Sequence, residues 1–363
     1  MIRRVLLAVA APVVAAATLG PLVDRMAARV VRAPRRGPEE GALVPALDAL
    51  GGEIVRIRAR DGLRLSARWL PAEVAVEVSV GDGAWRPDPR EAVVLLHGYS
   101  GSIAPDLLEY GPFLRRTTGV LGLDFRGHGD SDDSPTTFGM REVDDVAGAL
   151  AWLGERGIRR VALVGTSMGG ITAIASVAVL GDGRLAAADK DPDAPAAAVD
   201  TPRPELVAVV ADSVTSELAI VVASRVRFPF SRFVAERTFA RAARHLGGDM
   251  RATQPLRTVP LLEDVPLLLI HGTADDTVPI REGRRLAAAA PAGTRHLEFE
   301  GAGHSGAHAA EQERYEAEVT EFLREAFTAA RGRALGPDDD ARILSAGTPP
   351  GDASPDASDG ASG

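Results

Sequence analysis

The stretch Val164–Ile171 reads "VGTSMGGI" and sets a serine between two glycines, in the frame G-x-S-x-G. The apolar run "VALV" leads into it, and the helix-like run "ITAIASVAVL" follows it. This order predicts a strand that turns sharply into a helix, with Ser167 at the turn. Side chains at positions Gly165 and Gly169 would clash at such a turn, which explains the glycines. The alternative is that Ser167 merely opens a glycine-rich turn. Ser167 can act as a nucleophile only if the rest of the chain supplies a base and an acid.

The composition limits the classes of protein to which the chain can belong. The chain has 363 residues, of which 45% are hydrophobic and 25% are charged. This is enough to bury a large core, and we expect one domain of about 270 residues with appendages. The net charge of −9 argues against a nucleic-acid partner, which would require a basic surface. There are no cysteines, and no histidine–aspartate cluster has the spacing of metal ligands, so we expect no metal and no cofactor.

The N-terminus has the pattern of a membrane-targeting segment. Arg3 and Arg4 precede a run from Val5 to Val23 that contains no charge, and further arginines follow this run. Its length lies between that of a signal-peptide core and that of a membrane span. We therefore expect residues 1–36 to anchor the protein in a membrane, or to direct its export if the chain is cleaved after Ala17. A buried core helix is the alternative, but such helices rarely begin behind two N-terminal arginines.

Beyond a linker at 37–52, the pattern becomes that of an α/β domain over residues 53–333. Two alternating runs flank Asp61-Gly62, a dipeptide suited to a hairpin turn. Continuous apolar runs then alternate with helical stretches, which is typical of parallel strands covered on both faces. These runs are "AVVLLH", "GVLGLD", "RVALVG", "LVAVVAD" and "VPLLLIHG". The sequence therefore predicts a mostly parallel central sheet flanked by helices.

A serine hydroxyl is a poor nucleophile by itself, so a reactive Ser167 needs a histidine as its base. His304 stands in "GAGHSGAH", a glycine-rich loop between a short strand and the C-terminal helix, from which an imidazole can reach the end of the sheet. It is the favoured base, and His308, at the expected start of that helix, is a distant second. His245 and His296 show no local pattern. Other histidines end strands or lie in loops, where they more often brace the backbone: His97, His128 and His271.

The base in turn needs an acid, and three aspartates follow apolar strands. Asp275 and Asp276 lie beyond "VPLLLIHG", and Asp212 ends "LVAVVAD". Each of them could equally cap a helix or form a turn. Position alone leaves all three open.

Five motifs in order resemble those of the α/β-hydrolase fold family, over roughly Glu53–Ala330. "LLHGYSGS" is similar to the oxyanion loop, "LDFRGHGDS" to the loop after the next strand and "GTSMGG" to the nucleophile elbow. "HGTADDTVP" is similar to the acid loop, and "GAGH" to the histidine loop. The resemblance implies that Asp275 is the acid. The order Ser167, Asp275, His304 also agrees with the order in this family.

The resemblance implies acyl transfer, with an oxyanion hole formed by the backbone N–H groups of Tyr99 and Met168. We favour a serine hydrolase of the esterase or lipase type that cleaves carboxylic esters with a modest apolar acyl or alcohol part. An aminopeptidase- or amidase-like enzyme is the nearest alternative, and a catalytically silent, membrane-tethered binding protein is an alternative of another class. We also expect a short helical cap at 214–258, a mobile insertion at 181–205 and a disordered acidic tail at 334–363.

Overall fold

A computed structural model describes the chain over residues 20–21, 23–35, 40–73, 78–80, 83–99, 101–180, 203–225 and 231–334. The chain divides into two compact units, Met1–Phe327 and Thr328–Gly363, and all strands of the sheet belong to the first. Three predicted segments fall largely outside the described residues. They are the charge-free run before residue 20, the insertion at 181–205 and the tail at 334–363.

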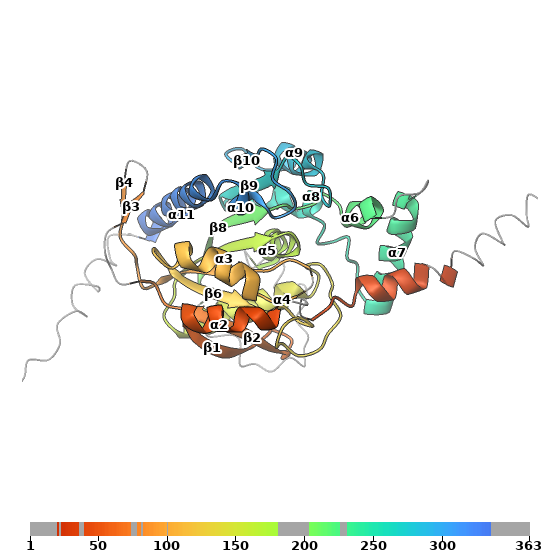
Figure 1. Cartoon of the computed structure of the whole chain (residues 1–363), viewed down its shortest axis with the longest axis horizontal. Coiled ribbons are helices and arrows are strands. Elements are labelled where there is room, and N and C mark those ends of the chain that lie inside the picture. Colours follow the sequence, from red (N-terminus) through yellow and green to blue (C-terminus); the bar gives the residue numbers. More distant parts are fainter. Residues whose placement is uncertain are drawn as a thin grey trace, which may run out of the picture. The chain divides into compact units, whose positions relative to one another are not determined.

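Among the described residues, eight strands form one sheet in the order β1-β2-β6-β5-β7-β8-β9-β10 (Figure 1). β1 pairs with β2, and β2 with β6, in antiparallel fashion, and the other neighbours are parallel. The predicted mostly parallel sheet is confirmed. The strands are β1 (Glu53–Arg58), β2 (Arg64–Leu70), β5 (Glu91–Leu96), β6 (Gly119–Leu123), β7 (Arg160–Thr166), β8 (Glu205–Asp212), β9 (Leu267–Gly272) and β10 (Arg295–Phe299), and a separate short hairpin pairs β3 (Val78–Val80) with β4 (Gly83–Trp85).

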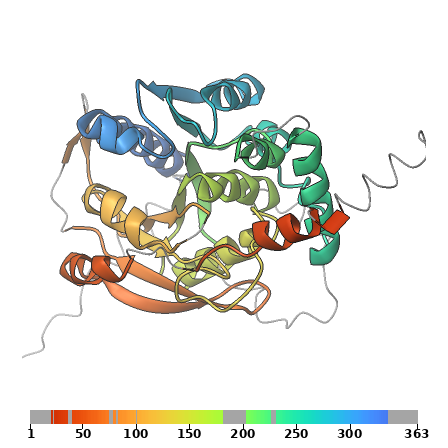
Figure 2. The same cartoon turned by 45° about the vertical axis from the view of Figure 1, so that its right-hand side comes forward.

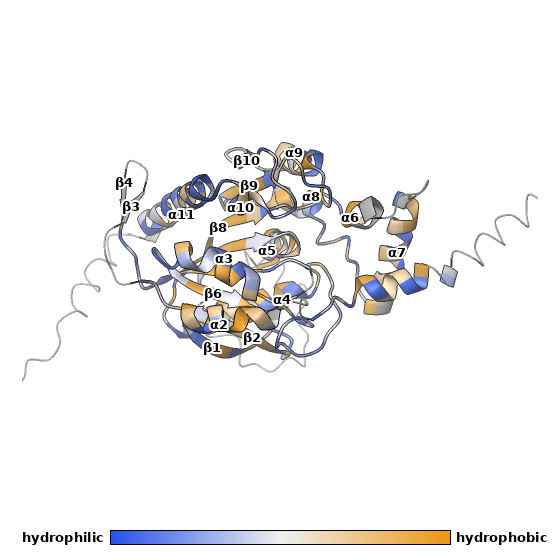
Figure 3. Ribbon diagram, in the orientation of Figure 1, coloured by the Kyte–Doolittle hydropathy of each residue, from blue (hydrophilic) through white to orange (hydrophobic). Residues whose placement is uncertain are grey.

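The continuous apolar runs form the buried centre of the sheet. Every residue of β5, β7 and β9 is buried, which requires cover on both faces. Figure 3 shows the labelled strands β8 and β9 coloured mainly as hydrophobic. At the antiparallel edge, buried and exposed residues alternate instead. β1 buries Val55 and Ile57, whereas Ile54 is exposed. The β1–β2 turn contains Gly62 at a φ of 88°, in agreement with the hairpin predicted at this dipeptide.

Helices cover the sheet and build the cap. Residues 168–177 of α5 are buried throughout, because α5 packs against β7, β8 and α4. The cap predicted at 214–258 contains α6 and α7, which pack against each other, and α8. The helices are α2 (Glu40–Leu50), α3 (Ala104–Leu114), α4 (Glu142–Glu155), α5 (Met168–Leu180), α6 (Leu218–Arg225), α7 (Ser231–Leu246), α8 (Pro255–Thr258), α9 (Ile280–Ala289), α10 (Ala307–Ala310) and α11 (Gln312–Ala334).

Residues 23–35, which we call the N-terminal strap, pack onto the first unit. The strap begins with a helical stretch that contains Val23 and Ala27 and is followed by Val31, and these three residues are at most 9% exposed. This stretch lies beside α7 in both views (Figures 1 and 2). An ion pair of 2.5 Å joins Asp24 of the strap to Arg241 of α7.

The strap also offers backbone carbonyl groups to the loops at the end of the sheet. The hydrogen bonds measure 2.7–2.9 Å and come from the N–H groups of the loops after β5 and β6: Gly101 to Pro34, Gly129 to Arg35 and Thr136 to Val31. These loops flank the end of β5, so the strap supports the part of the fold where a site is expected.

The strap and α2 differ from the predicted domain organisation. The sequence predicts a basic flank up to residue 36, a linker at 37–52 and a domain that begins at 53. In the structure, the apolar residues of the strap recur at helical spacing and face the domain, so the packed unit begins by residue 23. The predicted linker contains α2, which packs against α3.

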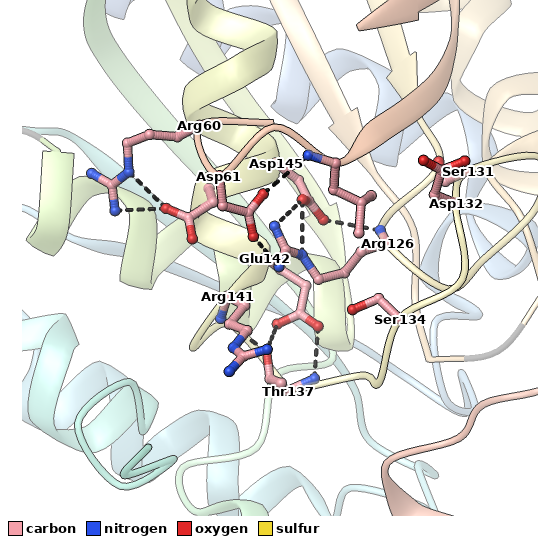
Figure 4. Close-up of polar contacts among 12 residues, drawn as sticks. Arg60, Asp61, Arg126, Ser131, Asp132, Ser134, Thr137, Arg141, Glu142 and Asp145 are labelled. Carbon is pink, nitrogen blue, oxygen red and sulfur yellow. Dashed lines mark hydrogen bonds and ion pairs between the residues drawn. The ribbon is translucent and has the colours of Figure 1, made fainter. Parts of the chain in front are cut away.

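A buried arginine fixes the loop that follows β6 (Figure 4). Arg126 is 1% exposed and donates two side-chain hydrogen bonds, of 2.9 and 2.7 Å, to Asp145 in α4. A third bond, of 2.8 Å, reaches Asp61 in the β1–β2 turn. Because a buried charge is costly unless it is paired, these bonds hold the hairpin, the loop and the helix in one arrangement.

Removal of the strap should destabilise the domain while leaving the sheet intact. We expect a chain that begins at Gly41 to melt about 5–10 °C below one that begins at Gly20. Burying a valine contributes about 1.5–3 kcal/mol, and the entropy of ordering the strap offsets part of this gain. Differential scanning calorimetry of both chains measures the difference. Equal melting temperatures would show that the strap contributes nothing to the packed domain.

Candidate active site

Ser167 lies between the last residue of β7 and the first residue of α5, at the predicted strand-to-helix turn. Its φ of 49° is in the left-handed region that L-residues rarely adopt. The flanking glycines are required by space. A Cβ added at Gly165 would lie 2.3 Å from the backbone of Gly169, and one added at Gly169 would lie 2.0 Å from the carbonyl oxygen of Leu96. The close approach of α5 to β5 and β7 therefore forces the sharp turn that presents the serine.

His304 and Asp275 come from two loops at the same end of the sheet. Asp275 follows β9 and His304 follows β10, and these strands are parallel neighbours. The Ser167 hydroxyl donates to His304 Nε2 at 3.0 Å, and His304 Nδ1 lies 2.7 Å from Asp275 Oδ2. The structure thus brings together the three residues that the sequence selects, in an unbroken chain of hydrogen bonds.

The carboxylate of Asp275 is held on both of its oxygens. Oδ1 accepts the backbone N–H groups of Thr277 at 2.9 Å and Val278 at 2.7 Å, and the side chain is fully buried. An ionised carboxylate can only accept, so His304 must donate its Nδ1–H to Oδ2. This tautomer leaves the lone pair of Nε2 free to accept the serine hydroxyl.

His271 supports this acid loop, a contact that the sequence did not specify beyond loop bracing. Its Nε2–H donates to the carbonyl oxygen of Val278 at 2.7 Å, and the same nitrogen lies 3.6 Å from Asp275 Oδ2. Burial lowers the pKa of His271, so the ring is neutral and adds no charge beside the carboxylate. The loop is thereby fixed from the β9 side.

The other two candidate acids lie elsewhere. Asp276 is exposed and accepts the hydroxyl of Thr277 at 3.4 Å. Asp212 is 1% exposed and accepts hydrogen bonds from Ser213 Oγ at 2.8 Å and from Tyr315 Oη at 3.3 Å. Burial raises the pKa of Asp212 to about 6, although these hydrogen bonds act in the opposite direction. Geometry therefore distinguishes Asp275, where sequence position left three candidates open.

The second candidate base, His308, lies away from the serine. Its Nδ1 is 3.1 Å from Glu109 and its Nε2 is 3.3 Å from Glu316. Burial opposes a charge on the ring, but the hydrogen bonds with both glutamates outweigh it and raise the pKa of His308. With a carboxylate at each nitrogen, this imidazole forms a structural link between α3 and α11.

His97 braces the loop that follows β5, as its position at a strand end predicts. Its Nε2 accepts the backbone N–H of Phe125 at 3.1 Å, and its Nδ1 lies 2.7 Å from the carbonyl oxygen of Gly98. Burial lowers the pKa of His97 to about 3, so it stays neutral. The ends of β5 and β6 are joined by this ring.

Both predicted oxyanion donors belong to segments beside the serine. Met168 begins α5, whose N-terminal end carries the positive end of the helix dipole. Tyr99 follows Gly98, and a Cβ added at Gly98 would lie 3.6 Å from the Cβ of Ser167. The phenol of Tyr99 donates to the carbonyl oxygen of Arg29 at 3.2 Å, so the strap holds this loop directly.

An aromatic row connects the oxyanion loop to the cap, and the sequence did not predict it. The ring of Phe138 stacks on that of Tyr99 at 5.3 Å and meets Phe239 of α7 edge-on at 5.8 Å. Phe138 has a φ of 52°, in a turn that Glu142 holds by accepting the N–H groups of Thr137 and Gly139. Figure 4 shows Glu142 beside Thr137. The available signal was Gly139 followed by an acidic helix start. The predicted cap residue Phe239 therefore packs within this row.

Within the part of the chain that the structure describes, no three histidine, aspartate or glutamate side chains are grouped as metal ligands. In the same part, no helix is long and apolar enough to cross a membrane. The charge-free run on which membrane anchoring was predicted lies mostly before residue 20, outside the described residues.

Residues 93–319, more than half of the chain, match the sequence model of the alpha/beta hydrolase family. No curated protein matches the chain in sequence.

Solved structures share the fold at low identity. An esterase of Pyrococcus furiosus superposes with a TM-score of 0.55 and 21% identity, over 82% of this chain and 98% of that chain. The alpha/beta hydrolase GrgF from Penicillium sp. sh18 gives 0.51 and 17%, over 76% of this chain and 99% of that chain. A membrane phospholipase A described as a bacterial virulence factor gives 0.50 and 18%, over 89% and 99%.

Substitution of the aspartates should separate their roles. Asp275→Asn should lower kcat by about 10³–10⁴, because the amide can hold His304 in the wrong tautomer. Asp276→Asn and Asp212→Asn should each stay within about tenfold, since neither carboxylate contacts the imidazole. Steady-state hydrolysis of a p-nitrophenyl ester measures kcat. A collapse with Asp212→Asn in a folded protein, without one for Asp275→Asn, would move the acid to the end of β8.

His308 should contribute to stability in a pH-dependent way and contribute little to turnover. Its folded-state pKa is raised, so its stabilisation is fully present below the unfolded pKa of about 6.5 and is lost as the pH rises through the folded value. We expect the wild type to exceed His308→Gln in free energy of unfolding by more at about pH 6 than at about pH 9. Urea denaturation at both pH values measures this. An equal difference at both, or a large loss of kcat, would contradict the structural role.

Proposed function

The chain belongs to the alpha/beta hydrolase family, and we propose that it is a serine hydrolase that cleaves carboxylic esters through an acyl-enzyme intermediate. One observation supports this proposal most strongly. It is the unbroken hydrogen-bond chain from Ser167 Oγ through both ring nitrogens of His304 to Asp275. Each atom in this chain has the donor or acceptor character that nucleophilic catalysis by serine requires.

In the first half of the reaction, Ser167 Oγ attacks the ester carbonyl carbon while His304 Nε2 takes the hydroxyl proton. The carbonyl oxygen becomes an oxyanion, which the backbone N–H groups of Met168 and Tyr99 stabilise. The imidazolium then gives its proton to the alcohol oxygen as the ester C–O bond breaks. The acyl group remains on Ser167 and the alcohol leaves.

In the second half, water replaces the alcohol. His304 Nε2 takes a proton from the water as its oxygen attacks the acyl carbon, and the resulting oxyanion occupies the same donors. The proton returns to Ser167 Oγ as the acyl bond breaks, and the carboxylic acid is released. In both halves, the buried carboxylate of Asp275 keeps the imidazole in one tautomer and stabilises its positive charge.

The aromatic row supports an apolar group in the substrate. Phe138 lies between Tyr99 of the oxyanion loop and Phe239 of the cap helix, so aromatic side chains extend from the oxyanion loop to α7. The Pyrococcus furiosus esterase among the structural neighbours is consistent with an ester substrate. We therefore propose small esters with an apolar acyl or alcohol part, and amides are the outcome that would revise the substrate class.

Membrane anchoring through the N-terminus is a further part of the proposal. It is supported by the charge-free run from Val5 to Val23 between arginines. The strap follows this run directly, so an anchored protein would present its oxyanion loop and cap helix next to the anchor. Cleavage after Ala17 would instead give an exported protein.

Turnover should depend on Ser167 and His304 as one unit. Ser167→Ala and His304→Ala should each lower kcat by about 10⁴–10⁶, and the double variant should be little worse, because each single change already removes the covalent route. The measurement uses p-nitrophenyl esters of rising chain length beside aminoacyl p-nitroanilides.

The variants, the substrate panel and a fluorophosphonate probe each test a different part of the proposal. Additive losses would contradict a shared catalytic unit, and preference for the anilides would replace the esterase by an amidase. Failure of a fluorophosphonate probe to label the wild type would favour the silent binding protein.

Cell fractionation should place the full-length protein with membranes. A chain that begins at Gly20 should be soluble and active, because it keeps the strap and loses the charge-free run. Immunoblotting of both fractions and sequencing of the mature N-terminus measure this. Soluble full-length protein with its first residues intact would contradict an anchor, and a mature chain starting at Thr18 would indicate a signal peptide.

A further inference from the structure

Ser213 occupies an unusual position directly after β8. It is fully buried, and its φ of 57° lies in the left-handed region, as do those of Ser167 and Ser305. Its hydroxyl donates to Asp212 Oδ1 at 2.8 Å and accepts the backbone N–H of Ser305 at 2.9 Å. Ser305 directly follows His304, so this hydroxyl holds the histidine loop one residue from the imidazole.

Asp212, the neighbour of Ser213, reaches the other side of the site. Its carbonyl oxygen accepts the backbone N–H of Ser167 at 2.8 Å. Its carboxylate is fixed by the hydroxyl of Ser213 and by that of Tyr315 in α11. The two adjacent residues therefore contact both the nucleophile turn and the histidine loop.

Further hydrogen bonds hold the backbone around Asp212 and Ser213. The N–H of Ser213 donates to the carbonyl oxygen of Ile270 at 2.9 Å, which ties the end of β8 to β9. The left-handed conformations of Ser213 and Ser305 persist because hydrogen bonds on both sides determine them. A loop held in this way has little freedom to shift along the sheet edge.

We propose that the backbone carbonyl group of Asp212 and the hydroxyl of Ser213 form a clamp that sets the separation of His304 and Ser167, and that Ser213 is a positioning residue for the reaction. This inference rests on the proposed serine hydrolase mechanism. Asp275 fixes the Nδ1 side of the imidazole, but a single hydrogen bond leaves the ring able to pivot away from the serine. The bond from Ser305 to Ser213 removes that freedom by fixing the loop itself. A misplacement of about 1 Å between reacting groups can cost about 10²-fold in rate.

The chain offers a matched pair of substitutions to test the clamp. Ser213→Gly and Ser305→Gly both place glycine where φ is positive, so each relieves the same kind of backbone strain. Ser213→Gly removes the clamping hydroxyl, whereas Ser305→Gly keeps the backbone N–H that the clamp binds. The readouts are kcat and KM for a p-nitrophenyl ester, the rate constant of labelling by a fluorophosphonate, and the melting temperature.

We expect Ser213→Gly to lower kcat and the labelling rate constant by about 10- to 100-fold, with KM within about threefold of the wild type. Ser305→Gly should keep at least about a third of the wild-type kcat. Ser213→Ala lacks the same oxygen but keeps Cβ, so it should reproduce the loss and provides the test if the glycine variant does not fold.

Two results would overturn the clamp alone, and a third would overturn the proposed mechanism as well. If Ser213→Gly and Ser213→Ala keep kcat at the level of Ser305→Gly while Ser167→Ala abolishes turnover, the clamp is overturned and the mechanism stands. A loss confined to KM also overturns the clamp, because it would place Ser213 in substrate binding. Turnover that survives in Ser167→Ala overturns both proposals.

Discussion

The site depends on a steric constraint at the end of β7, where three backbone segments meet without room for a Cβ atom. The helix α5 begins so close to β5 that an added Cβ at Gly169 would lie 2.0 Å from the carbonyl oxygen of Leu96. The chain can pass this point only by turning sharply, and Ser167 takes the left-handed conformation that the turn imposes. That strain is sustained by the buried strands on either side and by the hydrogen bond from its N–H to Asp212. The serine is thereby held at the sheet edge before any substrate arrives.

The parallel order of the sheet then supplies the remaining groups. The carboxyl ends of β5, β7, β8, β9 and β10 lie at one edge, so the segments that follow them can converge on the serine. β5 contributes the oxyanion loop, β8 the clamp, β9 the acid and β10 the histidine. Three of these segments are held by hydrogen bonds with a neighbour. The oxyanion loop donates to carbonyl groups of the strap, the histidine loop donates to the Ser213 hydroxyl, and the acid accepts from the backbone N–H groups of Thr277 and Val278. Preorganisation of this kind is what electrostatic stabilisation of an oxyanion requires.

Sequence patterns predicted the parts of the fold that local chemistry determines. Continuous apolar runs identified the parallel strands, and the glycines around Ser167 identified the turn, because both follow from burial and backbone space. His304 was selected over His308 from its glycine-rich loop, and the structure places the two rings accordingly. Asp275 could not be separated from Asp212 by position alone, since both end parallel strands. The resemblance to a known family made that choice.

Other features depend on contacts between distant segments, which a single sequence does not encode locally. The strap was predicted to be the basic flank of a membrane segment because its arginines follow the charge-free run. The sequence alone does not show that Val23, Ala27 and Val31 pack against the domain. The residues predicted to form a linker form α2 instead, because they pack against α3. Likewise, Glu142 and Phe138 acquire their roles from the turn that places one carboxylate under two backbone N–H groups.

The central claim is that Ser167 carries the acyl group during turnover. It is tested most directly by mixing the protein with a p-nitrophenyl ester, quenching in acid within the first turnovers and mapping the peptides by mass spectrometry. We expect the peptide containing Ser167 to gain the mass of one acyl group, and the His304→Ala protein to show no such gain on the same timescale. Hydrolysis of the ester without acylation of Ser167, or with the acyl group on another residue, would show that Ser167 is not the nucleophile.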